Sequence, residues 1–176
     1  MRKLENSELA RPSKEEFQQL AKVPIVVVLD NIRSCHNIGS VFRTSDALLI
    51  EKIFLCGISS TPPDKEIRKT ALGSENTVAW EYHPDTLEAV STLKAQGYTL
   101  IAVEQVEKSI SLSEYHPSVN SKLALVFGNE VKGVRQEVVN HCDLAIEIPQ
   151  YGTKHSFNIS VSVGIVLWDL FNKIRG

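Results

Sequence analysis

The chain has 176 residues, a length that suits one compact domain with a substantial hydrophobic core. Its 19 Lys and Arg residues nearly balance its 21 Asp and Glu residues, which excludes a strong overall positive field. Any polyanion therefore has to be bound by local clusters of charge. The three cysteines are scattered, odd in number and without metal-type spacing, so they predict reduced thiols in the cytoplasm and no disulfide framework.

Residues 1–22 form a short polar extension, and one domain is expected over residues 23–176. The extension is charged and has no apolar segment, which argues against a signal peptide. No window of the sequence is long and apolar enough to predict a membrane-spanning helix. Ser13 followed by Glu16 fits a capping box and predicts a short helix over residues 14–21. We attribute the basic residues of this segment to a solvated helix face.

The first strand–helix junction has an unusual arrangement of polar residues. A continuous β-branched run over residues 25–29 is typical of a buried parallel strand. A polar loop follows, and the spacing N-x-G-x-x-x-R then opens a helix with Asn37 as the expected N-cap. Arg43 is expected one turn beyond Gly39, close to the open end of that helix, where free backbone N–H groups favour an anion. A lone arginine is usually a surface ion-pair partner, but this spacing at such a junction favours a functional role.

The middle of the chain alternates between predicted strands and helices. Strands are expected over residues 52–56, 75–82 and 98–104, and helices over residues 64–69 and 85–96. Trp80 is expected in the core, and a polar tract covers residues 105–121. The side chains of Lys65, Arg68 and Lys69 fit a solvated helix face and a contact with a phosphate backbone equally well.

Two further junctions follow in the C-terminal half. An apolar strand over residues 123–127 leads into Gly128-Asn129-Glu130, and Gly133 precedes a helix expected over residues 134–142. Glycines flanking a polar pair at such a junction suggest a backbone that comes close to a ligand. A loose glycine pattern of this kind is weak evidence by itself.

The last junction starts from a strand over residues 143–148 and passes through Pro149 and a polar loop to Ser156-Phe157-Asn158. A buried helix is expected over residues 157–174, since this segment is too long for an ordinary strand. The histidine in the loop, His155, is interpreted as a solvated side chain. The alternation along the chain predicts an α/β domain with a mostly parallel sheet flanked by helices, whose three polar loops share the carboxyl edge of the sheet.

Three stretches resemble the motifs of a known family, in the family's order. They are NIGSVFRTSDA (37–47), LVFGNEVKGV (125–134) and IPQYGTKHSFNISVSVGIVLWD (148–169). Together they resemble the SpoU/TrmH RNA 2′-O-ribose methyltransferases of the SPOUT superfamily, over about residues 23–174. The resemblance implies an α/β fold with a C-terminal deep trefoil knot, a rare exception to unknotted chain topology. It also implies S-adenosylmethionine as cofactor, tRNA or rRNA as substrate, and a homodimer in which the partner completes each site.

The resemblance also assigns residues to roles. Catalytic roles fall on Arg43, Asn37, Glu130, Ser156 and Asn158. Contacts with the cofactor, largely through backbone groups, fall on Val103, Glu104, Gly128, Asn129, Ile148 and Phe157. The chain departs from the usual pattern at Phe157, where the family has Leu, and at Leu49-Ile50, where it often has Phe-Gly. No metal is expected, because no His, Cys or carboxylate cluster has ligand spacing.

Methyl transfer to a ribose hydroxyl mainly requires in-line alignment, together with stabilisation of the charge that develops on the oxygen. A guanidinium stays protonated in proteins, so Arg43 is expected to bind the adjacent phosphate and stabilise the forming alkoxide rather than act as a general base. If RNA is the substrate, the basic residues of the N-terminal extension have a second interpretation as an RNA-contacting arm. A solvated helix face remains the favoured interpretation.

The sequence also leaves two other functions to consider. The first is a catalytically silent RNA-binding knot protein, against which the intact motif residues argue. The second is a nucleotide-binding α/β enzyme acting on a small molecule, against which the absence of G-x-G-x-x-G and of a P-loop argues.

Overall fold

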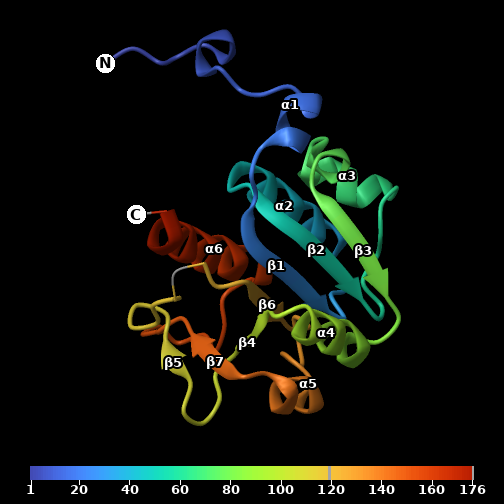
Figure 1. Cartoon of the computed structure of the whole chain (residues 1–176), viewed down its shortest axis with the longest axis vertical. Helices are drawn as coiled ribbons and strands as arrows, with labels where there is room; N and C mark the ends of the chain where they lie inside the picture. The colour runs from blue at the N-terminus through green and yellow to red at the C-terminus, as the bar shows by residue number, and fades with distance from the viewer. Residues whose placement is uncertain (119, 176) are drawn as a thin grey trace.

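Within residues 1–118 and 120–175, which the computed structural model describes, seven strands form one parallel sheet in the order β3-β2-β1-β6-β4-β7-β5 (Figure 1). The strands are β1 (Val23–Asp30), β2 (Ile50–Cys56), β3 (Ala79–His83), β4 (Thr99–Val103), β5 (Ile110–Ser111), β6 (Leu123–Phe127) and β7 (Leu144–Glu147). The helices are α1 (Lys14–Gln19), α2 (Cys35–Ala47), α3 (Lys65–Ala71), α4 (Thr86–Ala95), α5 (Gln136–His141) and α6 (Ile159–Arg175), with short 3₁₀ turns at Asn6–Leu9 and Ser74–Asn76.

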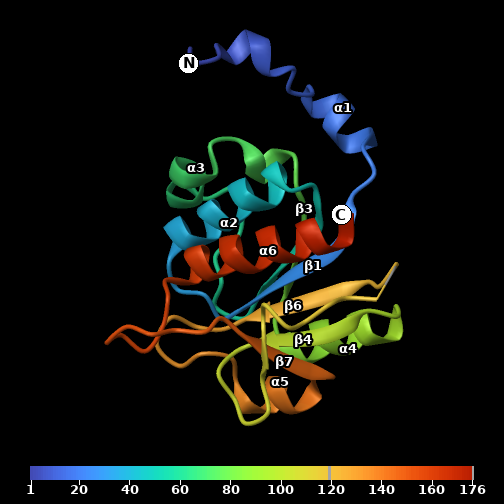
Figure 2. The ribbon, with the colours of Figure 1, turned by 90° about the vertical axis from the view of Figure 1, so that its left-hand side faces the viewer.

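Strand β1 lies near the middle of the sheet and is buried on both faces, which explains its uninterrupted apolar sequence. Ile25, Val27 and Leu29 face the core cluster that includes residues of α2 and α6. Val26 and Val28 face the opposite cluster, which includes residues of α4 and α5. Helices α2, α3 and α6 therefore cover one face of the sheet, and α4 and α5 cover the other (Figure 2). The prediction of a mostly parallel sheet flanked by helices is confirmed.

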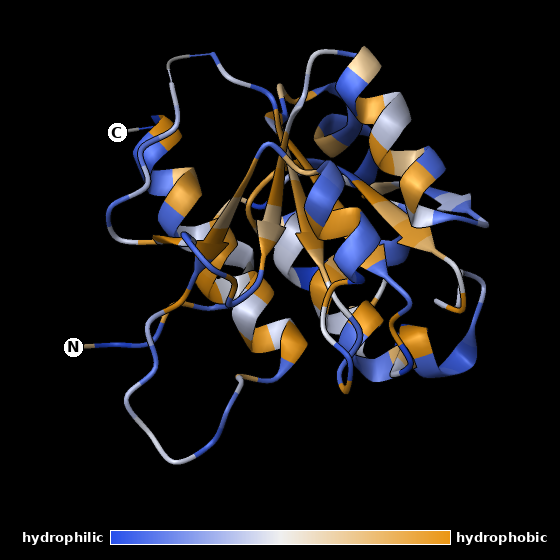
Figure 3. Cartoon of the chain, turned by 90° about the horizontal axis from the view of Figure 1, so that it is seen from below, coloured by the Kyte–Doolittle hydropathy of each residue, from blue (hydrophilic) through white to orange (hydrophobic). Residues whose placement is uncertain are grey.

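Hydropathy follows the same layering. The strands in the interior are hydrophobic along their length, whereas most of the connecting loops are polar (Figure 3). The N-terminal extension leads away from this body (Figure 1). Its residue Phe17 nevertheless packs into the larger core cluster. Its predicted capping box is present: Glu16 N donates to Ser13 Oγ at 3.2 Å and Ser13 N donates to the Glu16 carboxylate at 2.7 Å. Helix α1 ends at Gln19, two residues earlier than predicted.

Helix α2 corrects one prediction that matters for the site. Asn37 is not the N-cap, because the helix begins at Cys35 and is capped by Ser34, whose Oγ accepts a hydrogen bond from Asn37 N at 3.2 Å. Arg43 consequently lies more than two turns into the helix rather than near its open end. The side chain of Asn37 therefore does not cap the helix and can form other contacts.

The weakest predictions concern the edges of the sheet. Residues expected in a strand from 75 onwards first form a 3₁₀ turn, and β3 begins only at Ala79. Trp80 is half-buried on this edge strand rather than enclosed in the core. The short strand β5 lies in the polar tract, where no strand was predicted, and it pairs with β7. Edge strands are short and half-exposed, so their apolar pattern is faint.

Four neighbouring strands, β1, β6, β4 and β7, end at the same edge of the sheet because they are all parallel. The loops that follow them converge there, as the sequence predicted. Among the described residues there is no helix with the length and hydropathy needed to cross a membrane.

Candidate active site

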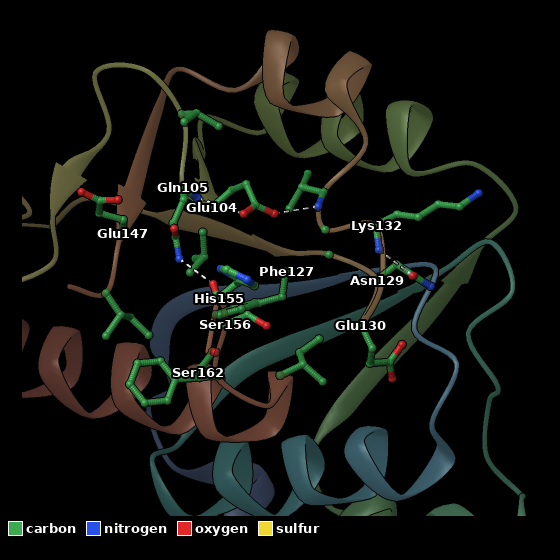
Figure 4. Close-up of a pocket in the computed structure, with 18 of the residues that line it drawn as sticks. Glu104, Gln105, Phe127, Asn129, Glu130, Lys132, Glu147, His155, Ser156 and Ser162 are labelled. Carbon is green, nitrogen blue, oxygen red and sulfur yellow. Dashed lines mark hydrogen bonds between the residues drawn. The ribbon is translucent and has the colours of Figure 1, made fainter. Parts of the chain in front are cut away.

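A pocket of about 720 Å³ opens at the carboxyl edge of the sheet, a volume typical of small-molecule sites. Its walls come from residues 103–106 after β4, 127–134 after β6, 147–150 after β7, and 155–159 at the start of α6 (Figure 4). Segments more than fifty residues apart in the chain thus form one cavity.

The loop between β6 and α5 forms a tight hairpin on one side of this pocket. Asn129 N donates to Gly133 O at 3.0 Å, and Gly133 N donates to Asn129 O at 2.8 Å. The Asn129 side chain accepts hydrogen bonds from the backbone N–H groups of Val131 and Lys132 and donates to Asn31 O at 2.7 Å. The hairpin is therefore closed on itself and fastened to the loop after β1.

Glu130 connects this hairpin to the start of α2. Its carboxylate accepts hydrogen bonds from Arg33 N and Ser34 N, each at 3.0 Å, and from Asn37 Nδ2 at 3.1 Å. Partial burial by itself raises the pKa of Glu130, but the hydrogen bonds from the Arg33, Glu130 and Ser34 backbones and from Asn37 outweigh it and lower the pKa below its ordinary value. The carboxylate is consequently ionised and fixed in orientation near neutral pH.

Asn37 also reaches the third motif. Its Oδ1 accepts a hydrogen bond from Asn158 Nδ2 at 3.2 Å, and Asn158 Oδ1 in turn accepts from Ser160 N at 2.9 Å as a cap of α6. Ser156 and Asn158 both line the pocket. The chain Glu130–Asn37–Asn158 therefore joins all three sequence motifs through side-chain hydrogen bonds at the pocket rim.

Arg43 is the one predicted catalytic residue that lies apart from this cluster. It is exposed on α2 and does not belong to the pocket lining, and among the described residues it forms no ion pair. With about 100° between successive helical residues, it shares the side of α2 that carries His36, whereas Asn37 faces α6. Within one chain, the structure does not bring Arg43 together with the other four.

The six residues assigned to the cofactor all line the pocket: Val103, Glu104, Gly128, Asn129, Ile148 and Phe157. Their chemistry is mixed, with apolar side chains, a glycine and the carboxylate of Glu104. Phe157 is partly exposed at the pocket mouth.

Some residues of the site were not selected from the sequence. Ser34 was not recognised as the cap of α2, although a serine just before an amphipathic run is an N-cap signal. Gln105 follows β4 at the same sheet edge, and its Nε2 donates to His155 O across the pocket at 3.1 Å (Figure 4). Its position directly after a predicted strand is a signal that could have identified it.

No group of three or more His, Cys, Asp or Glu side chains with metal-binding geometry occurs in the described part of the chain. The ionisable residues of the pocket lining are instead three carboxylates, one lysine and one histidine, namely Glu104, Glu130, Glu147, Lys132 and His155. The Lys132 side chain extends outward, and the Glu130 carboxylate is directed to the start of α2 (Figure 4).

Comparison with known proteins gives consistent matches. The model of the SpoU rRNA Methylase family matches residues 24–168. A 23S rRNA (guanosine-2′-O-)-methyltransferase, RlmB of Neisseria meningitidis, is 31% identical over 151 residues, which cover 86% of this chain and 59% of that protein. A tRNA (guanosine(18)-2′-O)-methyltransferase of Thermus thermophilus is 30% identical over 94% of this chain and 83% of its own length.

Solved structures agree with these sequences. The A. aeolicus TrmH/SpoU tRNA modifying enzyme has a TM-score of 0.80 and 25% identity, covering 91% of this chain and 81% of that one. The AdoMet-bound rRNA methyltransferase from Sinorhizobium meliloti has a TM-score of 0.79 over 89% of this chain and 59% of its own, and at 24% identity it supports the fold alone. The present chain thus spans a little over half of some relatives and most of others.

Proposed function

Because the chain belongs to the SpoU rRNA Methylase family, we propose that it is an S-adenosylmethionine-dependent RNA methyltransferase that methylates a ribose 2′-hydroxyl of tRNA or rRNA. The observation that carries the proposal is the Glu130–Asn37–Asn158 hydrogen-bonded chain, which gathers residues of all three motifs beside a pocket of cofactor size. Residues 23–176 are then the methyltransferase domain and residues 1–22 an extension.

The residues of the pocket fit S-adenosylmethionine. Apolar side chains of Val103, Ile148 and Phe157 suit an adenine ring, and Gly128, which has no side chain, lets a ligand approach its backbone. The three carboxylate residues of the lining, against one lysine, suit a ligand with a sulfonium and an ammonium group. When bound, S-adenosylmethionine supplies an activated methyl group.

The chain's own residues would contribute alignment and electrostatics. Glu130, Asn37 and Asn158 hold one another in fixed orientations, and Ser156 lies beside them on the pocket wall. Such a preorganised polar rim can orient a ribose without reorganising during the reaction. Arg43 would bind the phosphate next to that ribose and stabilise the negative charge that develops on the 2′-oxygen.

The direct test of this function combines cofactor binding and methyl transfer. Isothermal titration with S-adenosylmethionine is expected to give saturable binding, and tritiated cofactor with bulk RNA is expected to label RNA in an alkali-stable 2′-O-methyl form. Binding of RNA without methyl transfer would instead support the silent RNA-binding protein. Separating labelled tRNA from labelled rRNA then identifies the substrate, which we propose is tRNA.

We also propose a homodimer in which the partner subunit's Arg43 completes each site, because Arg43 stands apart from the pocket of its own chain. Helix α6 supports a dimer: Trp168 and Val161 are 61% and 48% exposed, and Trp168 stacks on Phe171 with ring centroids 6.4 Å apart. An apolar hollow lies beside Trp168 and includes Leu112. Exposed aromatic surface of this kind favours association.

Replacing Trp168 by Glu is expected to shift the protein from dimer to monomer at micromolar concentration, since a charge in an apolar interface is costly. Light scattering after size-exclusion chromatography measures the mass directly. The matched control is Ile58→Glu, because Ile58 is 66% exposed on another part of the surface. A wild-type monomer, or equal dissociation by both variants, would contradict the proposed interface.

Two finer features of the fold and setting belong to the same proposal. We propose that the chain from β7 into α6 threads a trefoil knot; support comes from the strand order, in which β4 precedes β6 and β7 in sequence yet lies between them. A crystal structure whose chain could be pulled straight from its ends would contradict this.

We place the protein in the cytoplasm, in keeping with free cysteines and RNA substrates. Cell fractionation checks this location.

A further inference from the structure

The carboxylate of Glu104 joins two segments that are far apart in sequence, the end of β4 and the hairpin between β6 and α5. Its Oε2 accepts a hydrogen bond from Val134 N at 3.0 Å. Its Oε1 accepts one from Gln105 N at 2.9 Å. Both oxygens are thus used by backbone N–H groups, and the bond to Val134 N runs along one wall of the pocket (Figure 4).

Two glycines allow this close contact. Gly133 has a φ of 67°, and a Cβ at this position would overlap the Glu104 carboxylate. A Cβ at Gly128 would overlap the backbone of Gly133 and Val134, where the two ends of the hairpin touch. The carboxylate therefore sits directly against the Gly133 backbone.

The two sides of this contact differ in rigidity. Glu104 N donates to Ile146 O at 3.0 Å, which continues the ladder between β4 and β7, so the sheet itself presents the carboxylate. The hairpin is a loop, and loops open more readily than central strands. The sheet therefore holds the carboxylate in place, and the more mobile hairpin takes its position from this contact.

We propose that Glu104 is a positioning residue, whose carboxylate sets the position of the hairpin Gly128–Val134 and thereby one wall of the cofactor pocket. The proposal rests on the function given above and assigns to the side chain of Glu104 a role apart from any cofactor contact of its backbone. The same hairpin carries Asn129 and Glu130, but these two side chains are also held by the loop after β1 and by the start of α2, so the loss of the Glu104 contact acts mainly on the cofactor wall.

The test compares Glu104→Ala and Glu104→Gln with the control Glu107→Gln, an exposed carboxylate in the same segment with no hydrogen bond among the described residues. In the protein without ligand, hydrogen exchange at the Val134 amide is expected to rise about tenfold in Glu104→Ala, because that N–H loses its acceptor. The same variant is expected to raise the dissociation constant and the KM for S-adenosylmethionine about tenfold, with the KM for RNA nearly unchanged. Glu104→Gln keeps one acceptor oxygen. Its exchange rate at Val134 and its dissociation constant for S-adenosylmethionine should therefore stay close to the parental values.

Unchanged exchange at Val134 in Glu104→Ala would overturn the proposal, as would equal losses for S-adenosylmethionine and RNA. If Glu104→Ala fails to fold, Gly133→Ala supplies the same measurements, since an added Cβ pushes the carboxylate off the hairpin. The exchange experiment needs no ligand. A wild-type protein that does not bind S-adenosylmethionine would therefore refute the proposed function while leaving the role of Glu104 in holding the hairpin separately measurable.

Discussion

Replacing Arg43 by Ala is expected to lower kcat for RNA methyl transfer by a factor of about 10²–10³, the loss typical of removing one group that stabilises developing charge. The side chain is exposed on α2 and forms no ion pair in the described part of the chain, so the substitution should leave the free energy of unfolding nearly unchanged. Single-turnover methylation at saturating cofactor measures the chemical step.

Arg43→Lys distinguishes charge from geometry at this position. Lysine keeps the positive charge but lacks the planar fork that binds a phosphate in two places, so kcat should remain well below the parental value. Arg68→Ala on the neighbouring helix α3 is the comparison, and it is expected to lower kcat by no more than about twofold. If Arg68 contacts the RNA backbone, the substitution raises the KM for RNA instead. Parental kcat in Arg43→Lys would refute the proposed role.

Mixing two inactive variants decides whether Arg43 acts within its own chain or in the partner's site. Arg43→Ala and Ser156→Ala are refolded together so that subunits redistribute at random. If the site is shared across a two-fold axis, one site in each mixed dimer is intact and about a quarter of the parental activity returns. If Arg43 serves its own chain, no activity returns.

Replacing Asp30 by Ala is expected to lower the free energy of unfolding by about 3 kcal/mol, the range for breaking a buried charge pair. Asp30 is fully buried at the end of β1. Its carboxylate accepts hydrogen bonds from Thr86 Oγ1 at 2.5 Å and from Arg135 N at 3.1 Å, and it lies 3.4 Å from Arg135 Nε. Removing it leaves these donors without an acceptor beside a partly buried guanidinium.

Urea denaturation measures this loss through the midpoint at an unchanged m-value. The control is Glu137→Gln, which removes a carboxylate 3.9 Å from the same guanidinium but on the surface, and it should cost less than about 0.5 kcal/mol. Because Arg135 follows the hairpin directly, Asp30→Ala should also weaken binding of S-adenosylmethionine. Equal stability of the two variants would show that the buried cluster does not anchor the site.

Much of the site could be predicted from short stretches of sequence. The glycines and polar residues after β6 and the Ser156–Asn158 segment before α6 stand at strand–helix junctions, and junctions of parallel strands share one sheet edge. The six cofactor assignments came from the family resemblance, and all six positions line one pocket. Their roles stay predictions until binding is measured.

Other features needed the fold. Asn37 was predicted as a cap because its local sequence suits one, yet Ser34 occupies that position and Asn37 instead connects Glu130 with Asn158. Nothing within a few residues of Asn37 encodes partners that lie 93 and 121 positions away. The same holds for Glu104, whose partner Val134 is brought to it by the pairing of β4 with β6.

The sequence by itself determined the strands of the sheet centre, the parallel layering and the edge where the loops meet, because burial on both faces leaves a continuous apolar run that is readable locally. Only the tertiary structure decided which polar side chains face one another across that edge, and that Arg43 lies away from them. The physical reason is that strand order and the rotation of each helix about its axis are set by packing between distant segments, and these two quantities determine where a side chain ends up.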